Sequence, residues 1–213
     1  MADLYIILGG WTRSESSYKK LILTAPKNTS VVFIPYKKLS AKHPAESLKL
    51  YIERLKIKRF NLIGHSLGGA IAISYTSLFP EAVSKLFLVD SAGIYGNENV
   101  FNLFTIFFKT RIKHGRKLFF KDLVSLYSII VNPFLHFRLG KFAHNANFIQ
   151  ELKTIKTPTT IIWGEKDHMT PLWQAKEINK LIDKSKLVVI DGVGHDWILH
   201  LPEKFWENLH QED

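Results

Sequence analysis

The sequence predicts a single-domain α/β protein, with about six mostly parallel strands flanked by helices. Three observations support this fold class. Short runs rich in Val, Ile, Leu and Phe recur along the chain, and turn residues bound each run. Stretches with apolar residues at helical spacing separate these runs, which is typical of strand-helix-strand units in a parallel sheet. The length of 213 residues and the hydrophobic content of 46% allow one substantial core.

The individual elements follow from these patterns. Strands are expected at residues 4–8, 31–35, 60–64, 85–90, 159–164 and 187–191. Helices are expected at residues 44–57, 67–79, 171–182 and 202–209. All of these helices except the second begin with Pro, which suits a first turn because an N–H there would have no helical partner. The second helix is small and apolar, as a helix buried against a sheet should be.

The alternation of strands and helices is interrupted between residues 93 and 150. This stretch contains ten of the 15 Phe residues and a cluster of Lys and Arg. We predict a helical cap here, inserted between two parts of an α/β core at residues 1–92 and 151–213. Phe104 and Phe108 are candidates for an apolar substrate pocket under the cap. If the Phe residues only pack the insertion onto the sheet, the pocket is expected around Trp11 and Trp197.

The composition excludes several classes of function. The chain has no Cys, which removes disulfides, thiolate nucleophiles and Cys-based metal sites. The formal net charge of +10 would attract nucleic acid, but no nucleic-acid-binding motif accompanies the dispersed Lys residues. No apolar run reaches the length of a membrane span. The N-terminal residues carry no basic leader, so we expect a cytoplasmic location.

The strongest chemical signal is a Gly-x-Ser-x-Gly motif from Gly64 to Gly68, directly between an expected strand and an expected helix. So sharp a turn holds its central residue in strained backbone geometry, and the two glycines remove side chains that would clash. Ser66 is thereby raised above the sheet, where the N–H groups at the start of the helix point. This arrangement predicts that Ser66 is a nucleophile.

A serine hydroxyl needs a general base, and His is the usual one. Among the nine His residues we select His195, because its loop follows the last expected strand and can reach the edge of the sheet beside Ser66. The base in turn needs an acidic partner that fixes its tautomer. Asp167, in the loop after the fifth expected strand, is the candidate. Asp90, at the end of the fourth strand, and Glu165 are the alternatives.

A tetrahedral intermediate requires N–H donors for its oxyanion. The backbone N–H of Leu67, directly after the nucleophile, is one candidate. The other is the N–H of Trp11, because Gly9 and Gly10 after the first strand allow the backbone to approach the site closely. The alternative for this glycine pair is a tight turn without a further role.

With these residues in place, the chain resembles the capped carboxylesterase, lactonase and carbon-carbon hydrolase branch of the α/β-hydrolase superfamily. The resemblance covers almost the whole chain, and the order Ser, Asp, His agrees with it. The matching segments are the nucleophile turn at residues 64–69, the acid loop at 163–167, the histidine loop at 194–195 and the last helix from Pro202. One departure is that Gly9 and Gly10 stand where the family usually has His-Gly.

The resemblance implies hydrolysis of a small-molecule ester or lactone without a metal or organic cofactor. Ser66 argues against dehalogenases and epoxide hydrolases, which resemble this fold but carry Asp at the same turn. We expect a carboxylesterase that prefers apolar acyl groups, with N-acyl-homoserine lactones as candidate substrates, acting as a monomer or homodimer. Two alternatives stay open: a carbon-carbon bond hydrolase of ring-cleavage diketones, which the residues from Asp90 to Gly93 suggest, and a non-catalytic small-ligand receptor.

Overall fold

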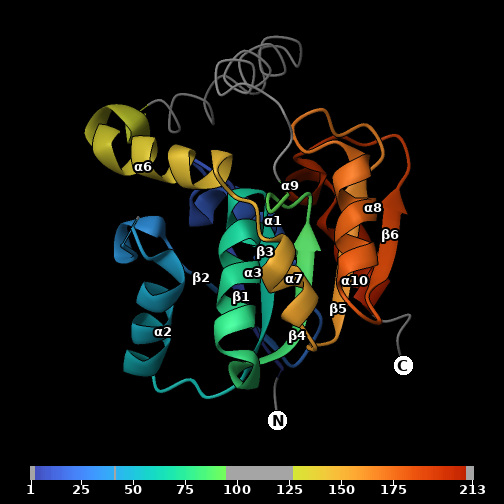
Figure 1. Ribbon diagram of the computed structural model, residues 1–213, viewed down its shortest axis with the longest axis horizontal. Helices are drawn as coiled ribbons and strands as arrows, with labels where there is room; N and C mark the ends of the chain where they lie inside the picture. The colour runs from blue at the N-terminus through green and yellow to red at the C-terminus, as the bar shows by residue number, and fades with distance from the viewer. Residues whose placement is uncertain (1–2, 41, 95–126, 210–213) are drawn as a thin grey trace.

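Six parallel strands form a sheet at the centre of the molecule (Figure 1), as the sequence predicts. The computed structural model describes residues 3–40, 42–94 and 127–209. The strands lie in the order β2-β1-β3-β4-β5-β6, and each neighbouring pair is parallel. Their bounds are Asp3–Leu8 (β1), Thr29–Phe33 (β2), Phe60–His65 (β3), Val83–Val89 (β4), Thr159–Gly164 (β5) and Lys186–Ile190 (β6). All carboxyl ends therefore meet at one edge, where open α/β sheets bind their ligands.

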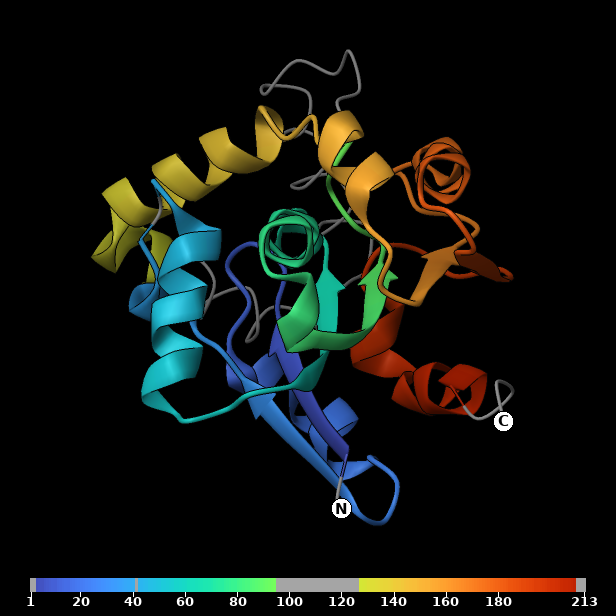
Figure 2. The same cartoon turned by 60° about the horizontal axis from the view of Figure 1, so that its bottom comes forward.

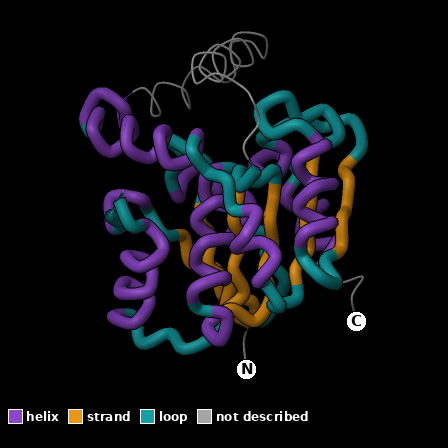
Figure 3. The backbone as a smooth tube through the Cα atoms, in the orientation of Figure 1, coloured by secondary structure: helices purple, strands orange, loops and turns teal. Residues whose placement is uncertain are grey.

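Helices cover both faces of the sheet, which gives three layers (Figure 3). One face packs against α2, α3, α7 and α8, and the other against α1, α9 and α10 (Figure 2). The bounds are Lys19–Leu23 (α1), Pro44–Arg54 (α2), Leu67–Leu78 (α3), Pro133–His144 (α6), Ile149–Thr154 (α7), Leu172–Leu181 (α8), Trp197–His200 (α9) and Pro202–Leu209 (α10). Three short 3₁₀ segments are Glu15–Tyr18 (η1), Tyr36–Lys38 (η2) and Pro80–Ala82 (η3).

Strand β1 contributes side chains to both faces of the sheet. Ile6 and Leu8 pack under α2 and α3, whereas Tyr5 and Ile7 pack on the side of α1 and α10. Ile6, Ile7 and Leu8 have no exposed surface. Burying an aliphatic side chain of this size stabilises a fold by about 1.5–3 kcal/mol. Both helical layers are therefore held to the same strand, and the loop that follows β1 starts from a rigid support.

Strand β2 ends earlier than the hydrophobic pattern suggests. It stops at Phe33 instead of residue 35. Ile34 still donates its N–H to the carbonyl of Ile7 at 3.0 Å. Pro35 has no N–H to continue the ladder, so the strand ends before it.

Helix α2 also ends earlier than expected, at Arg54 instead of residue 57. Lys56 lies in the left-handed region with a φ of 56°, and its N–H bonds to the carbonyl of Glu53. The N–H of Ile57 bonds to the carbonyl of Ile52 at 3.3 Å. These two bonds close the helix end in the way that a C-terminal Gly commonly does.

The structure describes the expected insertion at residues 93–94 and from residue 127 onward, and the second part is mostly helical. Helix α6 lies beyond the carboxyl ends of the strands (Figure 1), with Leu139 buried in the core. The indole N–H of Trp11 donates to the carbonyl of His136 at 3.2 Å, which fastens α6 to the loop after β1. The expected boundary between cap and core, after residue 150, falls inside α7. The division into core and cap stays a prediction.

Within the described ranges, no helix is both long and apolar enough to cross a membrane.

Candidate active site

Ser66 occupies the sharp turn between β3 and α3. Its φ of 55° and ψ of −121° place it in a backbone region that L-residues rarely adopt. A Cβ on Gly64 would lie 2.6 Å from the Cα of Gly69, and a Cβ on Gly68 would lie 2.0 Å from the carbonyl oxygen of Leu8. Both positions therefore require glycine, as the clash argument from the sequence predicts. The turn is closed by the N–H of Ser66, which bonds to the β4 carbonyl of Val89 at 3.0 Å.

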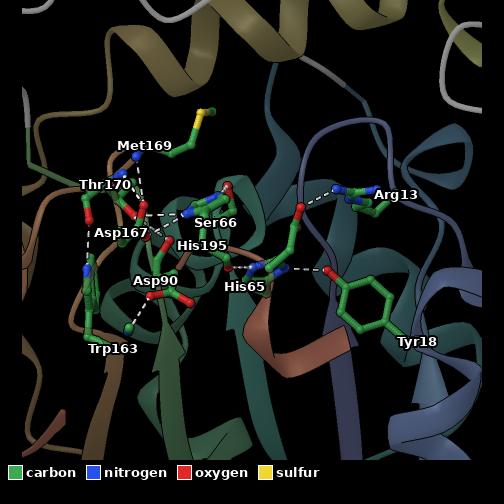
Figure 4. A network of polar contacts seen from close by, with 12 residues as sticks. Arg13, Tyr18, His65, Ser66, Asp90, Trp163, Asp167, Met169, Thr170 and His195 are labelled. Atoms are coloured by element: carbon green, nitrogen blue, oxygen red, sulfur yellow. Dashed lines mark hydrogen bonds and ion pairs between the residues drawn. The ribbon is translucent and has the colours of Figure 1, made fainter. Parts of the chain in front are cut away.

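His195 and Asp167 lie beside this serine (Figure 4). The Nε2 atom of His195 is 2.9 Å from the Oγ of Ser66, and its Nδ1 is 2.7 Å from the Oδ2 of Asp167. The carboxylate can only accept, so Nδ1 carries the proton and Nε2 is left to accept the serine proton. The three side chains come from the loops after β3, β5 and β6, at the carboxyl edge of the sheet.

Asp167 is buried, with 4% of its surface exposed, and hydrogen bonds stabilise its charge. Its Oδ1 accepts the N–H groups of Met169 at 2.7 Å and Thr170 at 3.0 Å. Its Oδ2 accepts the hydroxyl of Thr170 at 2.6 Å in addition to His195. Burial alone would raise the pKa of Asp167, but the charge of His195 and these bonds outweigh it and lower the pKa.

The contact between Asp167 and His195 also changes the pKa of His195, in the opposite direction. Burial alone would lower the pKa of His195, but the charge of Asp167 and its hydrogen bond outweigh burial, and the pKa is raised. Asp196 raises it further and Arg13 lowers it. The raised pKa makes the imidazole of His195 a stronger base.

Thr170 is a site residue that the sequence analysis did not identify. Besides the two bonds to Asp167, its Oγ1 lies 3.2 Å from the Nδ1 of His195 and 3.0 Å from the carbonyl oxygen of Asp90. A Thr three residues after Asp167 is a signal for a local turn in which the Asp side chain caps the following backbone. That signal shows a structured loop, but it does not reveal the contact with His195.

Neither alternative acid contacts His195. Asp90 is fully buried with a φ of 42°, and its Oδ1 accepts the N–H of Gly164 at 2.8 Å. Its Oδ2 has no hydrogen-bond partner in the described part of the chain. Burial, and then the nearby charge of Asp167, raise the pKa of Asp90 well above its ordinary value, so its protonated form is favoured. Glu165 instead accepts the N–H of Gly192 at 2.8 Å.

The two expected oxyanion donors belong to backbone segments next to Ser66. Leu67 is the first residue of α3, so its N–H has no acceptor one turn earlier in the helix. A Cβ on Gly10, the residue before Trp11, would be 3.4 Å from the Cβ of Ser66. The loop after β1 therefore passes next to the nucleophile. Whether the N–H of Trp11 stabilises an oxyanion stays a prediction.

Of the expected pocket residues Phe104, Phe108 and Trp197, the structure describes Trp197. Phe104 and Phe108 lie outside the described residues. Trp197 begins α9 and is 3% exposed, packed in the core between the sheet and α10. Its indole nitrogen has no hydrogen-bond partner within the described ranges. A substrate contact by Trp197 stays a prediction.

Two further polar contacts connect the loops of the site. Arg13, in the loop after β1, forms an ion pair with Asp196, the residue after His195, and its side chain is 6% exposed. His65 points away from Ser66, as expected, and its ring lies between Tyr18 and the backbone of His195 (Figure 4). No cluster of three or more metal-ligating His, Cys, Asp or Glu side chains occurs among the described residues.

Comparisons with known proteins agree with the fold. A family model described as alpha/beta hydrolase fold matches residues 34–128. The crystal structure of MGS-MChE2, an alpha/beta hydrolase enzyme from a sediment metagenome of the lagoon of Mar Chica, Morocco, is 27% identical with a TM-score of 0.72, over 99% of this chain and 90% of that one. The structure titled "Est816 as an N-Acyl homoserine lactone degrading enzyme" has a TM-score of 0.81 at 19% identity, over 100% of this chain and 94% of that one.

A curated relative adds a different reaction. The chain is 25% identical over 204 residues to a 2-hydroxy-6-oxononadienedioate/2-hydroxy-6-oxononatrienedioate hydrolase of a Pseudomonas species, which covers 85% of this chain and 72% of that protein. Across the first curated relatives the chain spans between 66% and 72% of their length.

Proposed function

We propose that this chain, which has the alpha/beta hydrolase fold, is a serine hydrolase that cleaves carboxylic esters or lactones with Ser66, His195 and Asp167. The observation that carries the proposal is the hydrogen-bonded row of these three side chains, with 2.9 Å from Ser66 to His195 and 2.7 Å from His195 to Asp167. Serine, histidine and an acid in this geometry are the general arrangement for nucleophilic acyl transfer.

The proposed reaction has two halves. In the first, the Oγ of Ser66 attacks the carbonyl carbon while its proton passes to the Nε2 of His195. The oxyanion that forms is stabilised by the N–H groups of Trp11 and Leu67. The carbon-oxygen bond to the leaving group then breaks, and the alkoxide takes the proton from His195. In the second half, water gives a proton to His195 and attacks the acyl-enzyme. The acid is released as Ser66 regains its proton.

The raised pKa of His195 is consistent with this role, since Asp167 stabilises the imidazolium that exists during each half. The substrate proposed is a small molecule with an apolar acyl group. Lactones are included because Est816, which shares the fold, is described as degrading N-acyl homoserine lactone. A monomer or homodimer and a cytoplasmic location stay predictions.

The direct test is the labelling of Ser66 by a fluorophosphonate, followed by hydrolysis of p-nitrophenyl esters of graded chain length and of N-acyl-homoserine lactones. Ser66→Ala should leave the fold intact and lower turnover by about 10⁶-fold, as loss of a triad nucleophile does. Turnover like that of the unaltered protein in a folded Ser66→Ala variant would exclude the mechanism.

A second candidate is the cleavage of a carbon-carbon bond in a ring-cleavage diketone, which the match to the Pseudomonas relative favours. The same serine and histidine would serve it. The two candidates differ in substrate, so the ester panel is run beside a 2-hydroxy-6-oxo-dienoate. Faster turnover of that compound than of any ester or lactone would move the proposal to this reaction.

A further inference from the structure

A buried chain of hydrogen bonds runs behind the nucleophile (Figure 4). The backbone N–H of Gly10 donates to the Oη of Tyr18 at 2.8 Å. Tyr18 lies 2.6 Å from the Nδ1 of His65, and the Nε2 of His65 lies 3.1 Å from the carbonyl oxygen of His195. Tyr18 and His65 have no exposed surface. The chain of bonds therefore connects the loop after β1, the end of β3 and the loop after β6, and neither side chain contacts solvent.

The direction of these bonds follows from the atoms at the two ends. A carbonyl oxygen can only accept, so the Nε2 of His65 must carry a proton. The Oη of Tyr18 already accepts a bond from Gly10, so its O–H group can donate to the Nδ1 of His65. His65 is then neutral, with Nδ1 as acceptor and Nε2 as donor. Burial, and then the nearby His195, lower the pKa of His65 to about 4, in agreement with a neutral ring.

The two ends of the chain are parts of the proposed machinery. Gly10 precedes Trp11, whose N–H is an expected oxyanion donor. A Cβ on Gly10 would lie 3.4 Å from the Cβ of Ser66. The carbonyl of His195 belongs to the residue that acts as base. A shift of His65 would move the base, and a shift of Tyr18 would move the oxyanion loop. The ring of Tyr18 is itself held by stacking on Phe33, with 5.4 Å between the ring centroids.

We propose that His65 is a positioning residue, which as a neutral Nε2–H ring holds the backbone of His195 and, through Tyr18, that of Gly10. This inference rests on the proposed function. Neither His65 nor Tyr18 touches the substrate in this role. They set the distance between the base and the oxyanion donors, on which the transition state depends and substrate binding does not.

Tyr18→Phe is the sharpest test, because it removes one hydroxyl and keeps the ring. Tyr75→Phe is the matched control, since it removes a hydroxyl from a ring that is 1% exposed in α3. With p-nitrophenyl butyrate, and with active sites counted by fluorophosphonate, Tyr18→Phe should lower kcat about ten- to a hundredfold. KM should change by less than about twofold, because binding is not affected. Tyr75→Phe should leave both constants unchanged.

Two variants of His65 separate positioning from packing. His65→Leu removes both hydrogen bonds and should lower kcat at least as much as Tyr18→Phe. In His65→Gln the side-chain amide can again donate to the carbonyl of His195, so part of kcat should return. Equal kcat in the Leu and Gln variants would overturn the positioning role. So would a Tyr18→Phe variant that matches Tyr75→Phe in kcat.

The tautomer has a readout that is independent of turnover. Nitrogen NMR of histidine-labelled protein should show a neutral Nε2–H ring at pH 6, absent from His65→Gln and with a shifted Nδ1 resonance in Tyr18→Phe. A protonated or Nδ1–H ring would overturn the inference even if esters are hydrolysed. Absence of turnover and labelling in the unaltered protein would instead count against the proposed function, while the NMR signals would still report on the hydrogen bonds.

Discussion

Two neighbouring buried carboxyl groups, Asp90 and Asp167, differ in protonation state because their surroundings differ. Asp167 accepts bonds from His195, Met169 and Thr170, and these favour its charged form. Asp90 accepts one N–H, and burial beside Asp167 favours its protonated form. A protonated carboxyl group cannot stabilise an imidazolium as a carboxylate does. The environment therefore assigns the acid role to Asp167, although both residues follow strands.

This difference predicts unequal effects of two isosteric changes. Asp167→Asn should lower kcat by about 10⁴-fold, because an amide favours the wrong tautomer of His195. Asp90→Asn keeps an oxygen for Gly164 and should change kcat by less than about tenfold. Ester hydrolysis by the two purified variants provides the measurement. If Asp90→Asn is the more damaging change, the acid is Asp90.

The pH dependence gives a second measurement on the same variant. His195 must be neutral to act as base, and Asp167 raises its pKa, so kcat/KM should fall as pH decreases through that pKa. Asp167→Asn removes the charge that raises the pKa while burial remains. The residual activity should therefore persist to lower pH than in the unaltered protein. An acid limb that stays in place would contradict the effect of Asp167 on His195.

The residues that carry the proposed chemistry could be predicted because each one has a local signal. Ser66 lies in a motif, and His195 and Asp167 follow recognisable strands. Tyr18, Arg13 and the contact of Thr170 with His195 could not be predicted, because the partners lie in distant parts of the chain. Tyr18 meets His65 across 47 positions and Arg13 meets Asp196 across 183. Such contacts depend on how the loops fold over the sheet edge.

At the scale of the elements, the nucleophile turn and helix α6 contain glycines with opposite roles. Gly68 lies in the first turn of α3 directly against β1, where a Cβ would overlap the carbonyl of Leu8. Gly140 lies inside α6, and a Cβ there would meet nothing within 4 Å. The first glycine permits a close approach of helix and strand. The second only weakens its helix.

The same substitution should therefore change stability in opposite directions. Gly68→Ala should reduce the free energy of unfolding by about 3 kcal/mol or more, because helix and strand must separate. Gly140→Ala should increase it by roughly 0.5–1 kcal/mol through helix propensity. Urea unfolding followed by circular dichroism measures both. A Gly68→Ala variant as stable as Gly140→Ala would contradict the packing of α3 on β1.

The expected cap leads to a prediction about specificity. If Phe104 and Phe108 line an acyl pocket, each buried methylene should add about 0.8 kcal/mol, or about fourfold in kcat/KM, until the pocket is full. Their replacement by Ala should flatten this profile over p-nitrophenyl esters and spare the shortest ones. Phe134→Ala, in α6 and 81% exposed, is the control. Unchanged profiles in folded variants would mean that these Phe residues only pack the insertion.

At the scale of the whole molecule, the parallel sheet brings distant loops to one edge. Ser66 and His195 are 129 positions apart, yet both follow strands whose carboxyl ends meet there. The strand pattern and the positions of Ser66 and His195 after their strands were enough to predict that these side chains lie close together. The end of α2 was less predictable, because Lys56 takes a left-handed backbone conformation that is not expected of Lys. The same edge buries a neutral histidine, which affects the stability of the whole fold.

His65 should make the protein less stable in mild acid. Burial, and then the charge of His195, lower its pKa from 6.5 to about 4, with Asp196 and the His195 carbonyl acting the other way and Arg13 acting in the same direction. Tyr18, the remaining neighbour, donates to the neutral ring. Between pH 6.5 and about 4 the unfolded chain therefore binds a proton that the folded chain does not. The free energy of unfolding should fall as pH decreases, by on the order of 3 kcal/mol in total.

The raised pKa of His195 acts above pH 6.5, so the two histidines contribute in different ranges. His65→Gln removes the titrating group, and its free energy of unfolding should depend less on pH between 6.5 and 4, whatever its value at neutral pH. His43→Gln, which removes a histidine at an exposed position before α2, is the matched control. Urea unfolding at several pH values provides the comparison. If the slope of His65→Gln equals that of His43→Gln, His65 must be charged in the folded protein, and its bond from Tyr18 must run in the opposite direction.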